Sequence, residues 1–118
     1  MNDNANSTDS FGATPLIISA CNRRSPKALS VMDLLLKHKA KVNKRNCFGW
    51  TALHYAARTG RKEMVQRLLE AGARSTIKNW KRKTAVDIAR EKGRHEIAQL
   101  IENGLPQVED TGLTKSAR

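Results

Sequence analysis

The chain has 118 residues, of which 39% are hydrophobic but only 4% aromatic, so a core must be built mainly from small and aliphatic side chains. Its 22 Lys and Arg residues against 11 Asp and Glu residues give a formal charge of +11. This length leaves little room for a second domain, two cysteines are too few for a disulfide framework, and the longest apolar runs are too short to cross a bilayer.

Two short helices are predicted at the start of the chain. Residues 1–10 are rich in Asn, Ser and Asp and are expected to form a flexible tail. The first helix then begins at Thr14, whose hydroxyl can accept a hydrogen bond from a free amide of the first turn. Pro15 suits that turn because its missing N–H is not needed there. A second helix follows around the apolar residues 31–36.

The middle of the chain predicts a second pair of helices. A helix is expected to begin at Thr51 and to end before Gly60, where the backbone can enter a tight turn. The next helix covers the apolar residues 64–69 and is expected to stop in a left-handed conformation at Gly72.

A third pair follows in the same order. Its first helix is predicted to begin at Thr84 and to end before Gly93, and its second helix covers residues 97–102. Gly104 is placed to end that helix in a left-handed conformation. Residues 105–118 are expected to form a second flexible tail.

These three pairs are copies of one repeated unit. Residues 51–57 return as residues 84–90 and are preceded by a similar stretch at 14–20, with spacings of 33 and 37 residues. A period of this size is typical of repeat proteins. Small residues such as Ala56 and Ala89 are expected to let neighbouring helices approach closely.

The repeated unit resembles the ankyrin repeat over about residues 11–104. The resemblance implies an all-α fold, a solenoid of three helix-turn-helix units with short β-hairpin-like connecting loops, and repeats at about 11–43, 44–76 and 77–104. The middle copy matches consensus residue types at Gly49, Thr51, Leu53, His54, Ala56, Ala57, Gly60, Val65, Leu68, Leu69, Gly72 and Ala73.

Four positions depart from the family pattern. Ala52 and Ala85 stand where the family prefers proline, and Lys39 replaces a glycine that ends a helix. Arg82 replaces a hairpin glycine, so the conformation of that hairpin stays open. Each departure is expected to weaken the local backbone preference.

The two ends of the stack differ in polarity. The last unit is expected to act as an end cap with a polar exterior, formed by Arg90, Glu91, Lys92, Arg94, His95, Glu96, Gln99 and Glu102. The first unit is more apolar and less obviously capped, through Leu16, Ile17, Ile18, Leu29, Val31 and Leu34.

The resemblance places a binding surface on the concave side, at the hairpin tips and the exposed face of the first helices. Residues 14–104 contain 20 basic against 7 acidic residues, which favours an acidic partner. Both tryptophans and one of two phenylalanines lie in hairpins, and aromatic side chains beside Arg are typical of binding surfaces. The predicted partner-binding residues are Arg45, Phe48, Trp50, Arg58, Lys78, Trp80, Lys81, Arg82 and Lys83.

We therefore expect a non-enzymatic adaptor or scaffold that binds an acidic protein segment, as a monomer, without metal or cofactor. One alternative is a module that binds RNA or DNA through the same basic surface. Another is that the rings only pack on neighbouring hairpins while the charges are solvated. The expected location is the cytoplasm, with the nucleus as the alternative.

No catalytic motif supports an enzyme. The sequence has no nucleophile elbow, no glycine loop for phosphates and no histidine pair at metal-ligand spacing. The resemblance implies that His54 is a structural residue, hydrogen-bonded beside Thr51. Cys21 and Cys47 are interpreted as reduced, ordinary small side chains.

Overall fold

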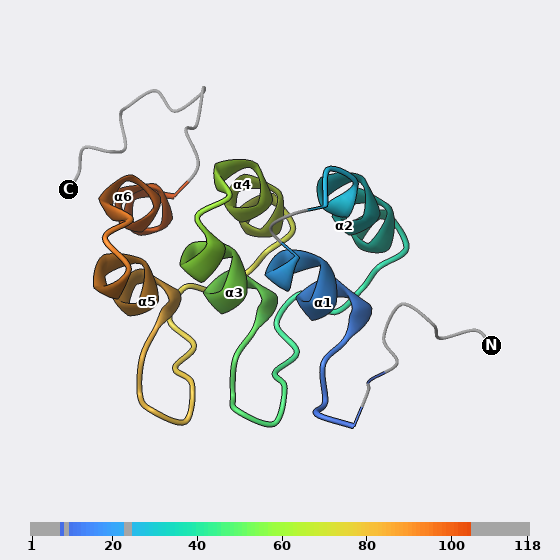
Figure 1. Cartoon of the computed structure of the whole chain (residues 1–118), viewed down its shortest axis with the longest axis horizontal. Helices are drawn as coiled ribbons and strands as arrows, with labels where there is room; N and C mark the ends of the chain where they lie inside the picture. The colour runs from blue at the N-terminus through green and yellow to red at the C-terminus, as the bar shows by residue number, and fades with distance from the viewer. Residues whose placement is uncertain (1–7, 9, 23–24, 105–118) are drawn as a thin grey trace.

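The structure, a computed structural model, describes residues 8, 10–22 and 25–104. These residues hold three pairs of helices that stand side by side in a row (Figure 1). One layer contains the first helix of each pair, and the second layer contains the other three, while a long loop projects beyond each helix of the first layer (Figure 1). In chain order the helices are α1 (Pro15–Cys21), α2 (Ala28–Lys37), α3 (Ala52–Thr59), α4 (Lys62–Glu70), α5 (Ala85–Glu91) and α6 (His95–Asn103).

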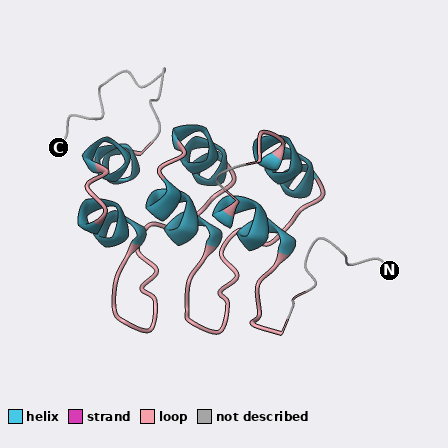
Figure 2. Ribbon diagram, viewed as in Figure 1, coloured by secondary structure: helices cyan, strands magenta, loops and turns pink. Residues whose placement is uncertain are grey.

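The described part of the chain is all-α, as predicted, and its connecting loops contain no strand (Figure 2). The loops nevertheless fold back in the manner of hairpins. The N–H of Asn46 donates to the carbonyl oxygen of Trp50 at 3.0 Å, and the N–H of Asn79 donates to that of Lys83 at 2.9 Å. The predicted division into tails and a repeat region stays a prediction, because residues 1–10 and 105–118 lie outside the described residues except for Thr8 and Ser10.

The first helix of each pair, α1, α3 and α5, begins where the sequence predicts. The hydroxyls of Thr14, Thr51 and Thr84 accept hydrogen bonds from the N–H groups three residues further on, at 3.2, 3.4 and 3.2 Å. Pro15 occupies the first turn of α1. These caps satisfy amides that have no partner within the helix, so a local residue choice fixes each helix start.

The helix end predicted at Gly60 is confirmed, whereas the left-handed conformation predicted at Gly104 is wrong. Gly60 ends α3 in the left-handed conformation, with φ 80° and ψ 19°. Gly104 ends α6 with φ 74° but ψ −173°, a positive-φ conformation that is open to glycine but lies outside the left-handed helical region. Its N–H still donates to the carbonyl oxygen of Leu100 at 2.9 Å, which gives the helix end its partner without the predicted turn.

Lys39 and Arg82 keep the backbone conformation of the glycines that they replace. Their φ angles are 66° and 67°. The N–H of Arg82 donates to the carbonyl oxygen of Asn79 at 2.8 Å and closes the hairpin, which settles the conformation that the sequence leaves open. A side chain in this region costs about 1–2 kcal/mol, so the repeat geometry overrides the local preference at both positions.

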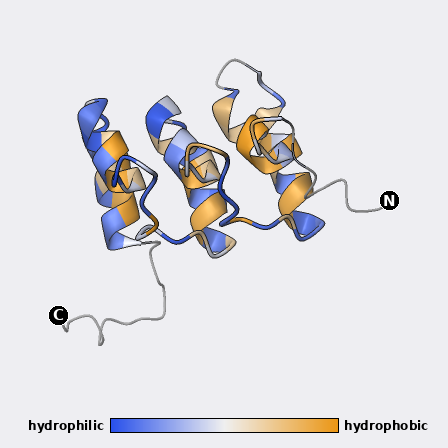
Figure 3. Cartoon of the chain, turned by 90° about the horizontal axis from the view of Figure 1, so that it is seen from below, coloured by the Kyte–Doolittle hydropathy of each residue, from blue (hydrophilic) through white to orange (hydrophobic). Residues whose placement is uncertain are grey.

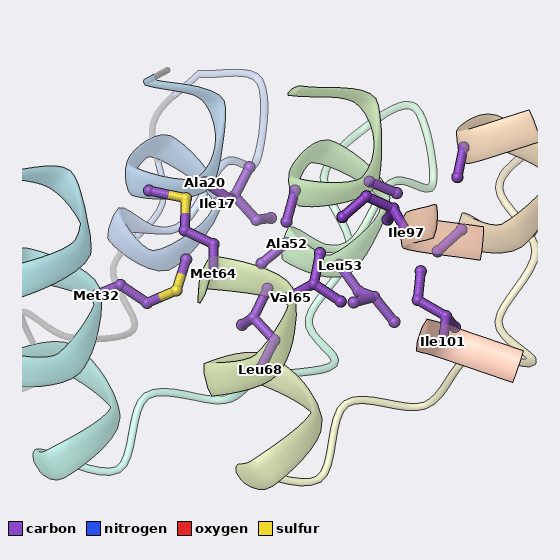
Figure 4. Close-up of a cluster of buried hydrophobic side chains, with 14 of the residues drawn as sticks. Ile17, Ala20, Met32, Ala52, Leu53, Met64, Val65, Leu68, Ile97 and Ile101 are labelled. Atoms are coloured by element: carbon purple, nitrogen blue, oxygen red, sulfur yellow. The ribbon is translucent and has the colours of Figure 1, made fainter. Parts of the chain in front are cut away.

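The core lies between the two helix layers and continues through all three repeats (Figure 4). Leu53, Met64 and Leu68 are at most 1% exposed. Ala56 and Ala89 are fully buried, as the prediction of close helix approach requires. Hydrophobic residues gather on the helices, while the loops are mostly hydrophilic (Figure 3). Each buried leucine contributes about 2 kcal/mol of transfer free energy, so the helix layers hold the hairpins in register.

The ends of the row differ as predicted, with one exception. At the N-terminal end, Ile18, Val31 and Leu34 remain 50%, 46% and 56% exposed. The polar residues predicted for the C-terminal end are exposed apart from Arg94, which is half-buried. Arg94 folds back against the middle repeat, and its Nε–H donates to the carbonyl oxygen of Arg58 at 2.9 Å.

Candidate protein-interaction surface

Each hairpin is held in shape by a buried asparagine at its base. The Oδ1 atom of Asn46 accepts hydrogen bonds from the N–H groups of Phe48 at 2.9 Å and Trp50 at 3.0 Å. Asn79, the matching residue of the next repeat, holds its own hairpin in the same way. The two asparagines are 7% and 3% exposed. The aromatic residues at the hairpin tips therefore stand on a fixed backbone.

Neighbouring hairpins are joined to one another. The N–H of Cys47 donates to the carbonyl oxygen of Phe11 at 2.8 Å, and the N–H of Trp80 donates to that of Phe48 at 3.2 Å. The indole N–H of Trp80 also donates to the carbonyl oxygen of Cys47 at 2.9 Å. These bonds cross from one repeat to the next, so they align the hairpin tips along one edge of the row.

A pocket of about 330 Å³ opens between the middle and last hairpins. We call it the aromatic pocket. Phe48 and Trp80 at its rim are 56% and 61% exposed, and Trp50 and Tyr55 are half-buried. The rings of Trp50 and Tyr55 lie 4.6 Å apart between centroids. The pocket is lined by Phe48, Trp50, Tyr55, Arg58, Trp80 and Lys81.

Two arginines lie over the rings of this pocket. The guanidinium carbon of Arg58 is 5.4 Å from the ring centroid of Trp50 and 5.1 Å from that of Tyr55. That of Arg45 is 5.1 Å from the ring centroid of Trp80. Such contacts hold the cations in place and leave their hydrogen-bond donors available to a ligand.

Most of the predicted partner-binding residues meet at the aromatic pocket, but three do not. Lys78 and Arg82 are exposed on the last hairpin and do not line it. Lys83 forms an ion pair with Glu91. Those that line the pocket are Phe48, Trp50, Arg58, Trp80 and Lys81, and Arg45 joins them through Trp80.

Tyr55 belongs to the pocket although the sequence prediction omits it. Its hydroxyl oxygen accepts a hydrogen bond from Nδ2 of Asn46 at 2.8 Å. Burial raises the pKa of Tyr55 above its ordinary value, so the phenol is neutral in the pocket. The sequence could have indicated that Tyr55 belongs to the site, because Tyr55 and Arg58 are three residues apart and share one face of the predicted helix.

The cations of the pocket lack acidic partners within the described residues. Ion pairs occupy other basic residues, such as Arg67 with Asp33 at 2.8 Å and Lys62 with Glu96 at 3.7 Å. Among the described residues no such pair involves Arg45, Arg58 or Lys81. Within the part of the chain that the structure describes, the aromatic pocket therefore has an uncompensated positive rim.

His54 lies behind this surface and links two repeats. Its Nε2 atom lies 2.9 Å from the carbonyl oxygen of Lys83, which can only accept, so Nε2 carries the proton. Its Nδ1 atom then accepts from the N–H of Thr51 at 3.0 Å. His54 is 1% exposed, and burial lowers the pKa of its imidazole below 6.5. The side chain is hydrogen-bonded beside Thr51, as predicted.

We expect acid to destabilise the fold through His54. Because the pKa of His54 is lowered in the folded state, its contribution to stability is complete above pH 6.5 and is lost as the pH falls through the folded pKa. Urea unfolding followed by circular dichroism at about pH 7.5 and about pH 5.5 measures this loss. In the His54→Gln variant the difference between these pH values should shrink. An unchanged difference would assign it to other groups.

Neither cysteine is in a disulfide, and the described residues contain no cluster suited to a metal ion. Cys21 is half-buried, Cys47 is exposed, and both are free thiols. Burial raises the pKa of Cys21, and the positive charge of Arg58 partly offsets this rise. Among the described residues no group of three His, Cys, Asp or Glu side chains is placed to hold a metal ion. None of the described helices is long and apolar enough to span a membrane.

A row of helix pairs with aligned hairpins defines a helical repeat protein. The family model described as "Ankyrin repeats (3 copies)" matches residues 1–79 and 27–111. The chain therefore belongs to the ankyrin repeat family, as its sequence pattern predicts. Ankyrin repeats are protein-binding modules.

Several larger proteins contain a similar segment. The chain is 36% identical over 96 residues to a rice protein, "Probable E3 ubiquitin-protein ligase XBOS34", covering 80% of this chain and 18% of that protein. It is 40% identical over 81 residues to human "NAD-capped RNA hydrolase NUDT12", covering 69% and 18%. It is 36% identical over 87 residues to rat "Ankyrin repeat and SAM domain-containing protein 6", covering 73% and 9%. The chain thus spans less than a fifth of the length of each.

Proposed function

We propose that the chain is a non-catalytic binding module that takes an acidic protein segment at the aromatic pocket. The observation that carries this proposal is the combination of exposed Phe48 and Trp80 with a rim of cations that have no acidic partner among the described residues. An apolar side chain of the segment would enter the pocket, and its carboxylates would meet Arg45, Arg58 and Lys81. Aromatic and Arg residues concentrate binding energy at protein interfaces, and the surrounding charge speeds association.

A nucleic-acid strand is the second candidate. The exposed indole of Trp80 with Arg45 on its face could stack on a base while the cations contact phosphates. A strand needs a continuous cationic track, however, and Glu91 neutralises Lys83 on the last repeat. This carboxylate favours a ligand that contacts the surface at separate points, as a peptide does.

His54, in the middle repeat, has a structural role in the proposed function and is not a catalytic base. Nε2 of His54 already carries a proton, which it donates to Lys83, and Nδ1 accepts from the N–H of Thr51, so Nδ1 cannot take a proton from a substrate without losing its bond to Thr51. This supports a binding role for the segment rather than catalysis. A cytoplasmic or nuclear location and a monomeric state remain the expectations that accompany it.

A peptide-display selection tests the proposal. Panning a random library on the wild-type protein is expected to enrich Asp and Glu around one apolar residue. The Trp80→Ala variant should then bind the selected peptide at least about tenfold more weakly, measured by fluorescence anisotropy, because it loses the exposed wall of the pocket.

The control is Leu34→Ala, which removes a side chain of similar exposure from α2, away from the hairpins. It should leave the affinity unchanged, and circular dichroism should show both variants folded. Selection without acidic enrichment, or equal affinity in the two variants, would refute the proposal. Tighter binding of a single-stranded oligonucleotide than of any selected peptide, at moderate salt, would favour the second candidate.

A further inference from the structure

A second pocket, of about 380 Å³, lies beside the aromatic pocket. It is formed where α1, α3 and α5 end, so it spans all three repeats. We call it the cationic pocket. Arg58 lines both pockets, which makes them neighbours on one surface. The cationic pocket is lined by Cys21, Arg58, Thr59, Lys92 and Arg94.

Arg94 is built into this pocket by contacts with the middle repeat. Its Nε–H donates to the carbonyl oxygen of Arg58, which leaves the two terminal nitrogens of the guanidinium for a ligand. The side chain lies against Gly60, where an added Cβ would come within 2.6 Å of Cδ of Arg94. A glycine at this helix end therefore makes room for the arginine.

The lining of the cationic pocket is positive without compensation. It contains three cations and no carboxylate. Within the described residues no ion pair involves Arg58, Lys92 or Arg94, whereas Arg67, Lys83 and Arg90 each have a carboxylate partner. Like charges gathered around one pocket repel one another, and an anionic ligand would relieve that repulsion.

We propose that the cationic pocket binds a phosphoryl group carried by the same protein segment that occupies the aromatic pocket. This inference rests on the proposed function. One carboxylate supplies a single negative charge, while a phosphorylated side chain supplies about −1.5 to −2 and three acceptor oxygens. Guanidinium groups match these oxygens with paired hydrogen bonds. Three cations that line one pocket therefore fit a phosphorylated Ser, Thr or Tyr better than Asp or Glu.

Arg58 connects the two halves of this recognition. Its guanidinium lies over Trp50 and Tyr55 in the aromatic pocket and also lines the cationic pocket. A segment with an apolar residue close to its phosphorylated residue could fill both pockets at once. The ion pair between Lys83 and Glu91, which is next in sequence to Lys92, interrupts the positive charge beside the pocket, and this favours a phosphopeptide over a nucleic-acid strand with a run of phosphates.

Two matched peptide libraries test this inference. One has a fixed phosphoserine and random flanking residues, and the other has a fixed serine in the same place. We expect the phosphoserine library to be retained at least about tenfold better by the wild-type protein, with an apolar residue selected near the phosphoserine. Lys92→Gln should reduce this preference several-fold, because Lys92 is exposed and contributes charge rather than packing. Lys37→Gln makes the same charge change on α2 and should leave the preference unchanged.

The outcomes separate this inference from the proposed function. If both libraries bind equally through Trp80, the phosphoryl site is refuted and the acidic-segment function stands. If phosphoserine peptides bind through Lys92 but Trp80→Ala has no effect, the proposed function and the two-pocket segment both fall. If neither library binds, or a 5′-phosphorylated oligonucleotide displaces every selected peptide, both proposals are refuted.

Discussion

Replacing His54 by alanine is expected to lower the free energy of unfolding by about 3 kcal/mol. The imidazole is 1% exposed and joins the start of α3 to the hairpin of the next repeat. Alanine would leave the N–H of Thr51 and the carbonyl oxygen of Lys83 without these partners, and it would leave a cavity. Urea unfolding followed by far-UV circular dichroism measures the change.

The matching position of the last repeat provides the control. The carboxylate of Asp87 accepts from the N–H of Thr84 at 3.0 Å, so it caps its helix as His54 does. Among the described residues it has no hydrogen bond to another repeat corresponding to that between His54 and Lys83. Asp87→Ala should therefore cost only about 1 kcal/mol. Equal losses in the two variants would show that the bond between repeats contributes little.

The features that the sequence predicts well are those fixed by neighbouring residues. A threonine followed by a helical pattern is sufficient to predict where α1, α3 and α5 begin, because the threonine and the amide that it caps are three residues apart. The repeat spacing then gives the order of helices and hairpins. It also places Phe48, Trp50 and Trp80 in the hairpins, where none of these three is part of the core.

The composition of the site depends on contacts between repeats, which local patterns do not reveal. Arg94 was expected on the polar exterior, but it folds onto Gly60, which lies 34 positions earlier. Lys83 is predicted to contact a partner, and in the structure it forms an ion pair with Glu91. Both outcomes follow from the relative placement of helices and hairpins rather than from residue type.

The side-chain amides of the two hairpin asparagines also differ in a way that the repeat pattern does not predict. In the middle repeat, Nδ2 of Asn46 donates to the hydroxyl of Tyr55. In the last repeat, Nδ2 of Asn79 has no partner among the described residues. The residue matching Tyr55 there is Ile88, which has no hydroxyl. The hairpin keeps its shape, because Oδ1 of Asn79 still accepts its two backbone hydrogen bonds. The unpartnered Nδ2 group lowers the folding stability by about 1–3 kcal/mol.

Replacing Gly49 by alanine is expected to destabilise the fold by about 3 kcal/mol and to displace Trp80. Gly49 has φ +80°, and an added Cβ would lie 2.7 Å from Cδ2 and 2.8 Å from the backbone N of Trp80. That backbone cannot easily move, since its N–H donates to the carbonyl oxygen of Phe48. Urea unfolding measures the stability, and the tryptophan fluorescence spectrum reports the displacement.

Gly93→Ala separates the two causes of this effect. Gly93 has φ +74°, so alanine there meets a similar backbone strain, but its Cβ would have nothing within 4 Å. The control should cost about 1–2 kcal/mol and leave the fluorescence spectrum unchanged. The clash with Trp80 then accounts for the additional loss of stability in Gly49→Ala. This variant should also bind acidic peptides more weakly at the aromatic pocket. Equal losses of stability, with Trp80 undisturbed in both variants, would mean that the hairpins adjust without strain.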